Sequence, residues 1–588
     1  MKRGKYFMNR KKLMATMAGV MALSVGLTAC GSSDDKTSDG NKPVDNNKEN
    51  KIQVVKATNP DKLPDAAKNR KDTLVVGLQL PDGIFNPLYS DSAYDNQINE
   101  TLFAPLLQYK ADGTLEAALS ELPKISEDKK TYTFKLKDGV KWSDGEPITT
   151  DDIEFTYKII ADKGYTGPSD MPTLDIVGWK DYNEGKSKEI SGVKKIDKQT
   201  IEVTVANPKA PLEAYLAVTP IPAHYYGKNY TQGKADEVLQ PLHRKPEVTS
   251  GAYKFKSYTE GQEVVLTANE NFYKGKAKIP NLIFKVVSKD TYLQLLQTGE
   301  IDMVNATIKE ETMEQIADMG FVDVHYWPNN GYGYMGFNLL GENSKFKDPK
   351  VRQALTYGLD RKTIVQNVYG PYADPINIPQ SALSWAFNDE GTEKYEFNTE
   401  KAAKLLEEAG WKKNSNGILE KDGKEFEIRF LQTTPNEVND ALVPVAIKNY
   451  EALGIKFTPE QMDFPTLRKK LDDAKAGKAG ADYDMFFMAW GLNPEPDVTT
   501  IFSSKGTQNK NGYNNPKVDE LLSKGLNEFD LEKRKEIYHE MYKELNSNLP
   551  YIYVYQRKDG WAVNSRVEGF TMSPYRNFTY DIQTFTLK

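Results

Sequence analysis

The sequence predicts an α/β protein built from more than one domain. Segments with alternating apolar residues, typical of strands, take turns with segments whose apolar residues recur every three or four positions, as in helices. No period of 20–50 residues, which would indicate a solenoid, is present. More than 500 residues follow position 70, which is too many for one hydrophobic core, so we expect two or three domains.

The chain begins with a segment typical of a secretory signal, which we assign to residues 1–29. Six lysine and arginine residues precede a mostly apolar run, Leu13 to Leu27, that is too short to span a bilayer comfortably and ends in small residues. Cys30, the only cysteine of the chain, follows directly. Residues 27–31 resemble a bacterial lipobox, which implies that Cys30 carries a diacylglyceryl group. The alternative is an ordinary thiol in a signal that is removed whole.

Residues 30–70 predict a flexible, lipid-anchored tether. They are mostly Ser, Asp, Asn, Lys, Gly and Pro and offer few apolar side chains to bury. A coil of about 40 residues has a root-mean-square reach of roughly 35 Å.

Cleavage after residue 29 removes six positive charges and no negative ones, so the formal net charge moves from −6 to −12. Such an acidic chain argues against nucleic acid as a partner.

Residues 131–142 predict a hairpin. Apolar residues alternate with polar ones from Thr131 to Lys137, as in a half-buried strand. Asp138-Gly139 then provides a pair suited to a tight turn, because glycine accepts a positive φ without penalty. We expect Val140–Trp142 to form the short return strand.

A helix follows this hairpin. Thr149 and Asp152 have the spacing of a capping box, in which each side chain bonds to the other's backbone N–H. Ile153, Tyr157 and Ile160 then lie on one side of the helix.

Later segments follow the same rules. We expect strands at 73–80, 425–431, 483–490 and 549–555, and helices at 441–453 and 530–545. Asp348 with Pro349, and Asn398, are typical helix starts, whereas Gly299, Gly410 and Gly454 are typical helix ends. The run from Tyr483 to Trp490 is almost uninterruptedly apolar, which favours a strand buried on both faces.

The sequences of several segments resemble those of one family, the extracellular solute-binding proteins of family 5, which are the peptide- and nickel-binding receptors of ABC importers. Residues 132–156 (YTFKLKDGVKWSDGEPITTDDIEFT) are similar to the family's signature, and three further segments match it: Ile221–His224, Ser250–Tyr253 and Val351–Leu355. The resemblance covers about residues 70–588. It implies a two-lobed, type II periplasmic-binding-protein-like fold of the large three-domain cluster, with a central ligand cleft and a hinge.

The resemblance also implies a domain arrangement. Lobe 1 would comprise 71–110, 245–325 and 556–588, with a small inserted domain at 111–244, and lobe 2 would comprise 326–555. It implies a monomeric receptor, not an enzyme, on the extracellular face of the cell membrane. That receptor captures oligopeptides by β-augmentation and passes them to the permease and ATPase subunits of an importer.

Three groups of residues are candidates for the ligand site. The first is the loop Trp490-Gly491-Leu492-Asn493, because many peptide-binding relatives have an aspartate at the last of these positions, which pairs with the ligand's α-ammonium. The neutral Asn493 departs from that pattern. Either the ligand is held by its backbone alone, or Glu495 or Asp497 provides the charge, or the ligand lacks a free amine. The second group is Tyr332, Tyr334 and Asn338; the third is Phe85 and Asn86. Each aromatic residue has the alternative of a purely structural role.

No catalytic, cofactor or metal site is predicted. The four histidines, at positions 224, 243, 325 and 539, lack the paired spacing of metal ligands, which weakens nickel as a cargo. Other cargoes stay open: a signalling peptide, an oligosaccharide or a chelated metal. A surface hydrolase is the alternative from a different class, since a two-carboxylate glycosidase leaves no short motif.

Overall fold

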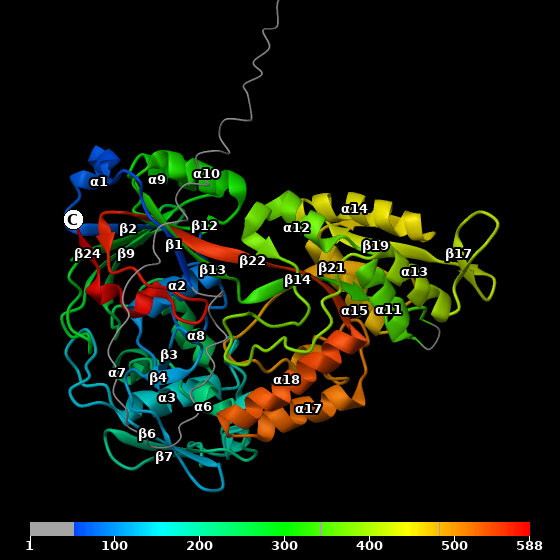
Figure 1. Cartoon of the computed structure of the whole chain (residues 1–588). Helices are drawn as coiled ribbons and strands as arrows, with labels where there is room; N and C mark the ends of the chain where they lie inside the picture. The colour runs from blue at the N-terminus through cyan, green and yellow to red at the C-terminus, as the bar shows by residue number, and fades with distance from the viewer. Residues whose placement is uncertain (1–51, 342–343, 481) are drawn as a thin grey trace, which may run out of the picture. The chain divides into compact units, whose positions relative to one another are not determined.

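One strand, β22 (Tyr551–Asn564), connects the two halves of the fold (Figure 1). Its first part pairs with β14 (Gly331–Phe337), and its second part pairs with β12 (Met303–Thr307) and β13 (Val322–Pro328), in each case antiparallel. The computed structural model describes residues 52–341, 344–480 and 482–588.

These strands belong to a 13-stranded sheet with the order β20-β19-β21-β14-β22-β12-β2-β11-β10-β9, to which β1, β13 and β15 attach. The other strands of this sheet are β1 (Gln53–Val55), β2 (Thr73–Leu78), β9 (Tyr253–Thr259), β10 (Glu263–Ala268), β11 (Asn281–Val286), β15 (Ala373–Asp374), β19 (Glu427–Thr433), β20 (Lys456–Met462) and β21 (Met485–Gly491).

Four smaller sheets complete the strands of the described ranges. They are formed by β3 (Leu107–Tyr109) with β4 (Leu115–Ala117); by β5 (Lys124–Ile125), β6 (Thr131–Lys135), β8 (Thr200–Thr204) and β7 (Val193–Lys195); by β16 (Lys412–Lys413), β17 (Leu419–Lys421) and β18 (Lys424–Glu425); and by β23 (Val567–Glu568) with β24 (Thr586–Leu587).

The α-helices cover these sheets. They are α1 (Asp65–Lys68), α2 (Ala93–Leu102), α3 (Thr150–Ile160), α4 (Met171–Leu174), α5 (Trp179–Asn183), α6 (Leu212–Tyr215), α7 (Ala223–Tyr226), α8 (Ala235–Leu239), α9 (Tyr292–Gln297), α10 (Glu310–Met319), α11 (Pro349–Tyr357), α12 (Arg361–Tyr369), α13 (Thr399–Glu408), α14 (Glu437–Leu453), α15 (Phe464–Lys475), α16 (Thr499–Phe502), α17 (Pro516–Asn527) and α18 (Leu531–Asn548). None of these helices combines the length and the apolar composition that a bilayer crossing needs.

Three hydrophobic cores define two lobes. One core uses residues from Tyr332 to Tyr555, and we call the structure around it lobe 2. The other two cores draw on residues before position 328 and after position 560, and we call the structure around them lobe 1. Because β22 contributes to cores on both sides, the lobes share one continuous backbone ladder. The domain boundaries given above stay a prediction.

Several local predictions are confirmed. Thr149 and Asp152 form a capping box at the start of α3, and Asp348 caps α11 with Pro349 in its first turn. Gly454 has a φ of 89° directly after α14, a left-handed conformation that glycine adopts without strain. The predicted strands at 73–80 and 425–431 correspond to β2 and β19.

The predicted return strand at Val140–Trp142 is wrong. Trp142 N–H donates to the Glu146 carbonyl (2.8 Å) and Ile148 N–H donates to the Val140 carbonyl (3.1 Å), so this segment closes on itself as a turn. The edge of β6 that it was expected to fill is paired with β8, whose residues lie almost 70 positions later. Trp142 is buried in the core of lobe 1, which fixes the turn in place.

The tether prediction is wrong for residues 52–70. Strand β1 pairs with β13, and α1 buries Ala67. Arg70 donates to the Asp302 carboxylate at 2.8 Å, so the end of this segment is bonded to lobe 1. The short, polar stretch is ordered by long-range pairing that its composition does not reveal. The signal, Cys30 and the tether as far as residue 51 lie outside the described residues.

Strand β21 also differs from its prediction. Met485, Phe486 and Phe487 are buried, as expected for a strand covered on both faces. Ala489 and Gly491 are exposed, so the second half of the strand reaches the surface. The strand therefore begins in the core of lobe 2 and ends at a solvent-accessible edge.

Candidate ligand-binding site

The exposed half of β21 has an unoccupied edge. On one side β21 pairs with β14 over its whole length, from Phe337–Met485 to Gly331–Gly491. On the other side β19 pairs with it only at Met485 and Phe486. Across the described ranges no strand continues that ladder, so the backbone groups from Phe487 to Gly491 are available to an incoming extended chain.

Trp490 stands on this edge strand, directly opposite Tyr332 of β14. Its indole ring lies parallel to the Tyr334 ring, with centroids 6.1 Å apart and planes 2° apart. Trp490 is half-buried, so part of the residue is accessible to solvent. This placement suits a ring that contacts a ligand lying along β21.

Tyr332 and Tyr334 are buried rather than presented at the surface. Their exposed fractions are 3% and 2%, and their neighbours are Tyr551 and Tyr553 of β22. Burial raises the pKa of both phenols well above its ordinary value. The two tyrosines therefore connect Trp490 to β22, because Tyr334 packs against the indole and both tyrosines pack against rings of β22.

Two glycines of β14 are required by this packing. A Cβ at Gly333 would lie 2.2 Å from the Tyr555 ring, and a Cβ at Gly336 would lie 2.3 Å from the Phe486 ring. Larger residues cannot occupy these positions without moving the aromatic rings that hold β14, β21 and β22 together.

The loop after β21 is fixed by backbone bonds. Leu492 N–H donates to the Asn330 carbonyl at 2.8 Å, and the Asn330 amide donates to the Leu492 carbonyl at 2.7 Å. Asn493 follows this double contact and is exposed. The fixed loop therefore presents the neutral amide of Asn493 at the position where, by the family resemblance, many relatives have an aspartate.

Glu495 is not a free charge. Its carboxylate pairs with the Arg534 guanidinium, and the two side chains are only 10% and 7% exposed. Arg534 also donates to the Gly525 carbonyl (3.0 Å) and the Tyr538 hydroxyl (3.1 Å). Burial raises the pKa of Glu495, although the guanidinium opposes that shift. This pair is satisfied within the protein.

The other predicted site residues lie elsewhere. Asn338 is at the far end of β14 from Trp490, where its amide donates to the Tyr483 carbonyl at 2.8 Å. Phe85 and Asn86 are fully buried in lobe 1, and the Asn86 side chain accepts from Leu88 N–H at 3.0 Å. The structure therefore brings Tyr332 and Tyr334 together with the Trp490 loop, but not Asn338, Phe85 or Asn86.

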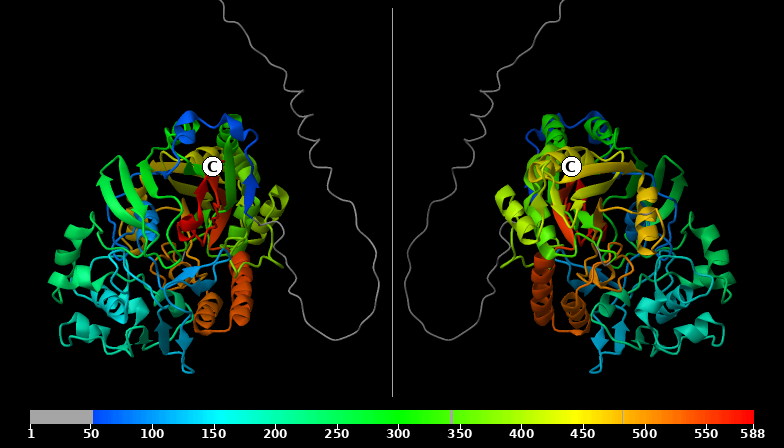
Figure 2. Two further views of the ribbon diagram at one scale, coloured as in Figure 1. Left: turned by 90° about the vertical axis from the view of Figure 1, so that its left-hand side faces the viewer. Right: turned by 90° about the vertical axis from the view of Figure 1, so that its right-hand side faces the viewer.

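A cavity of about 340 Å³ lies between the lobes. Lobe 1 provides one wall and lobe 2 the other; the lining includes Tyr109, Lys129, Glu213, Trp385, Glu495, Phe529 and Arg534. Two contacts cross beside it: Ala210 N–H donates to the Leu526 carbonyl at 2.8 Å, and the Lys129 ammonium lies 5.6 Å from the centre of the Phe529 ring. Figures 1 and 2 show α17 and α18 of lobe 2 beside the part of lobe 1 that contains α6.

A second cavity of about 340 Å³ opens where three parallel strands end in lobe 1. Its lining comes from the carboxyl ends of β2, β11 and β12, and from α2 and the segment near Asn577. In open α/β sheets, ligands bind at the carboxyl ends of the strands. Of the residues that line these two cavities, sequence analysis names Glu495 alone as a site candidate, because the linings come from segments up to several hundred residues apart.

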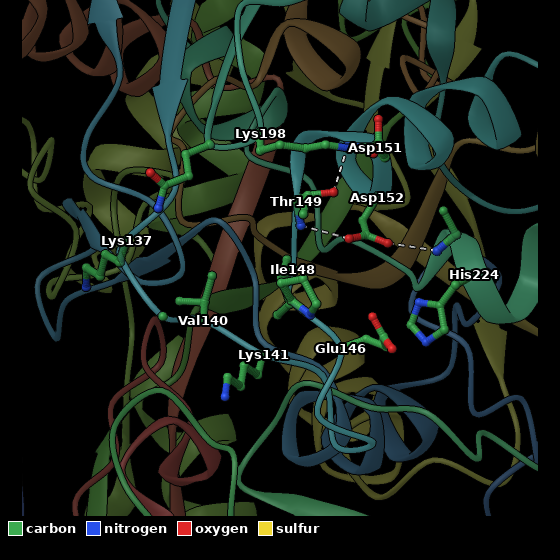
Figure 3. A pocket seen from close by; sticks show the side chains of 14 residues that line it. Lys137, Val140, Lys141, Glu146, Ile148, Thr149, Asp151, Asp152, Lys198 and His224 are labelled. Atoms are coloured by element: carbon green, nitrogen blue, oxygen red, sulfur yellow. Dashed lines mark hydrogen bonds and ion pairs between the residues drawn. The ribbon is translucent and has the colours of Figure 1, made fainter.

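A third cavity, of about 590 Å³, belongs to lobe 1 alone (Figure 3). Several of its charged side chains are bonded to neighbouring groups of lobe 1. The Asp152 carboxylate accepts from Thr149 N–H (2.9 Å) and Ala223 N–H (2.8 Å), and burial raises its pKa; Lys198 pairs with Asp151 at 2.5 Å. These groups hold the start of α3 against α7, so we assign the cavity no ligand.

The sequence of this chain is similar to those of known proteins. The chain matches the family described as "Bacterial extracellular solute-binding proteins, family 5 Middle" over residues 114–512, which is more than half of its length. It is 29% identical to the oligopeptide-binding protein AppA of Bacillus subtilis (strain 168), in an alignment that covers 98% of this chain and 99% of that protein. It is 26% identical to heme-binding protein A of Haemophilus influenzae, over 84% of this chain and 89% of that protein.

The fold is also similar to that of a solved structure. AppA from Bacillus subtilis, in complex with a nonapeptide, superposes with a TM-score of 0.68 at 27% identity, covering 88% of this chain and 99% of that one. The predicted two-lobed, type II periplasmic-binding fold is confirmed. The chain belongs to the bacterial extracellular solute-binding proteins of family 5.

Proposed function

We propose that this protein captures oligopeptides between its two lobes, outside the cell, and delivers them to the permease and ATPase subunits of an ABC importer. Its ligand would lie along the open edge of β21 and contact Trp490, Gly491, Leu492 and Asn493. Tyr332 and Tyr334 would act indirectly, by holding the Trp490 ring. Tyr109 and the other residues of the inter-lobe cavity would contact ligand side chains.

The unoccupied edge of β21 is the observation that carries this proposal. An extended peptide can add to it as a strand, because the groups it exposes are the N–H and C=O groups that such a chain pairs with. Backbone pairing accepts many sequences, and the cavity between the lobes leaves room for ligand side chains. The similarity to an oligopeptide-binding protein, including one solved with a nonapeptide, supports the same cargo.

A thermal-shift titration with a mixed peptide library tests the proposal. A ligand that binds only the folded protein stabilises it by roughly 3 kcal/mol at a hundredfold excess over the dissociation constant. We therefore expect the melting temperature to rise with library concentration. An unchanged melting temperature at saturating dose would mean that peptide is the wrong cargo.

We further propose that Cys30 is lipidated and anchors the protein to the extracellular face of the membrane. The support is the sequence around Cys30, the single cysteine of the chain. Two acyl chains give stable anchoring, whereas one gives only marginal binding. Replacing the thiol in Cys30→Ser should move the protein from the membrane fraction to the soluble fraction. Retention of the variant in the membrane fraction would contradict the anchor.

The main alternative within this family is another cargo. Similarity to a heme-binding protein favours a chelated metal as the second candidate. A mass spectrum of whatever co-purifies with the native protein separates these cases, because a peptide mixture, a single signalling peptide, an oligosaccharide and a metal chelate have different masses and fragments. A random library that binds poorly beside one tight sequence would indicate a signalling receptor. Turnover of peptides or glycans would favour a hydrolase.

A further inference from the structure

The inter-lobe cavity contains one carboxylate that the protein itself does not neutralise. Among the charged residues that line it, Glu495 and Arg534 pair with each other, and Lys129 lies against the ring of Phe529. Glu213, on α6, has neither a hydrogen-bond partner nor a cationic nitrogen within 4 Å in the described part of the chain. The cavity therefore holds one satisfied ion pair and one isolated carboxylate.

The surroundings of Glu213 disfavour the ionised form of its carboxylate. The side chain is half-buried, and burial raises its pKa. A carboxylate that has lost part of its hydration without gaining a partner is stabilised by any cation that enters. The apolar and aromatic residues beside it, among them Ile125, Trp385 and Leu531, suit the aliphatic stem of a lysine or arginine side chain.

We propose that Glu213 makes the inter-lobe cavity selective for a cationic group of the ligand. This inference rests on the proposed peptide-binding function and adds a charge preference to it. The group is an ammonium or guanidinium, which either a lysine or arginine side chain or a free N-terminus can provide. The neutral Asn493 and the paired Glu495 leave Glu213 as the carboxylate in this cavity that is available to such a group.

Calorimetric titration of the purified full-length protein with alanine hexapeptides tests this selectivity. The peptides carry one lysine, norleucine or glutamate at each position in turn, and each is made with a free and an acetylated N-terminus. The lysine and norleucine pair isolates the side-chain cation, whereas the free and acetylated pair isolates the N-terminal ammonium. We expect one of these cations to tighten binding about tenfold or more, since a charge-assisted hydrogen bond has that strength.

In Glu213→Gln this advantage should fall to about threefold or less, while neutral peptides keep their affinity within about twofold. Glu237→Gln is the matched control, because Glu237 is an exposed glutamate of lobe 1 that does not line the cavity, so the preference should persist there. Glu213→Ala serves as a second variant with the same expectation. Both variants should melt no lower than the native protein, because they remove an uncompensated charge.

Three results would overturn the inference. Equal binding of cationic and neutral peptides by the native protein excludes a charge preference but leaves the peptide-binding function standing. An undiminished preference in Glu213→Gln assigns the preference to another residue. Absence of binding by every peptide, neutral ones included, removes the proposed function and this inference with it.

Discussion

The indole of Trp490 and the phenol ring of Tyr334 lie parallel, with centroids 6.1 Å apart, although their residues are 156 positions apart in the chain. The contact joins the edge strand β21 to the aromatic core beneath β14. Tyr334 packs in turn on Tyr551, at 4.1 Å between ring centroids. The Trp490 ring is therefore linked through Tyr334 to β22, the strand that both lobes share.

Trp490→Ala should weaken peptide binding about tenfold or more, because an aromatic anchor beside the ligand is lost. Calorimetric titration of the same peptide against native and variant protein measures this loss. Tyr334→Phe keeps the stacked ring and should bind nearly as the native protein does. Equal affinities of native protein and Trp490→Ala would place the ligand away from this edge.

Asn493→Asp should create a selective advantage for peptides with a free N-terminus. The exposed loop position would gain a carboxylate, and a charge-assisted hydrogen bond contributes about 1.5–3 kcal/mol. The measurement is the affinity ratio of free to acetylated peptide, which should rise in the variant. Asn416→Asp, an exposed change in a distant loop, should leave that ratio unaltered. A ratio that does not rise in Asn493→Asp would show that the ligand's N-terminus does not reach this loop.

Asp302→Asn should destabilise lobe 1 by about 3–5 kcal/mol, because it leaves a buried guanidinium without its counter-charge. Arg566 donates to both carboxylate oxygens of Asp302, at 2.8 and 3.0 Å, and the two side chains are 1% and 0% exposed. The same carboxylate accepts from the N–H of Val75, the third residue of β2.

Urea unfolding followed by circular dichroism measures this loss. Glu300→Gln is the control, because it breaks the exposed pair with Lys285 and should cost about 1 kcal/mol or less. Similar losses in the two variants would contradict the buried character of the Asp302–Arg566 pair.

Glu100 should make stability depend on pH between about 4.5 and 7. Burial raises its pKa to about 7, although hydrogen bonds from Thr579 and Asn577 oppose the shift. The folded protein thus holds this proton more tightly than the unfolded chain does. The resulting stabilisation is complete below the unfolded pKa and is lost as the pH rises through about 7.

Glu100→Gln removes this dependence. Relative to the native protein, the variant should gain roughly 1–3 kcal/mol in its free energy of unfolding between pH 4 and pH 8. Urea unfolding at a series of pH values gives both curves. Parallel curves for the two proteins would show that Glu100 titrates at its ordinary pKa.

Local features of the fold were predictable because each depends on a few consecutive residues. The capping box at Thr149 and Asp152 follows from the reach of two short side chains, and the helix end at Gly454 follows from a conformation that favours glycine. The Trp490 loop became a candidate site through the family resemblance together with its position directly after a strongly apolar strand. The predictions for Val140–Trp142 and for residues 52–70 are wrong because the pairing there involves distant segments: β8 pairs with β6, and β13 pairs with β1.

The class of the fold and the family of the chain can be inferred from the order of the residues alone, and so can the loop at the end of β21 as a candidate site. Three features depend on the folded arrangement: the side of β21 that stays unpaired, the packing of Tyr334 against the indole of Trp490, and the cavity that Glu213 shares with Arg534. The physical reason is that pairing partners, burial and desolvation depend on segments far apart in the chain. Local composition sets what a segment can form, and the packing of distant segments sets what it contacts.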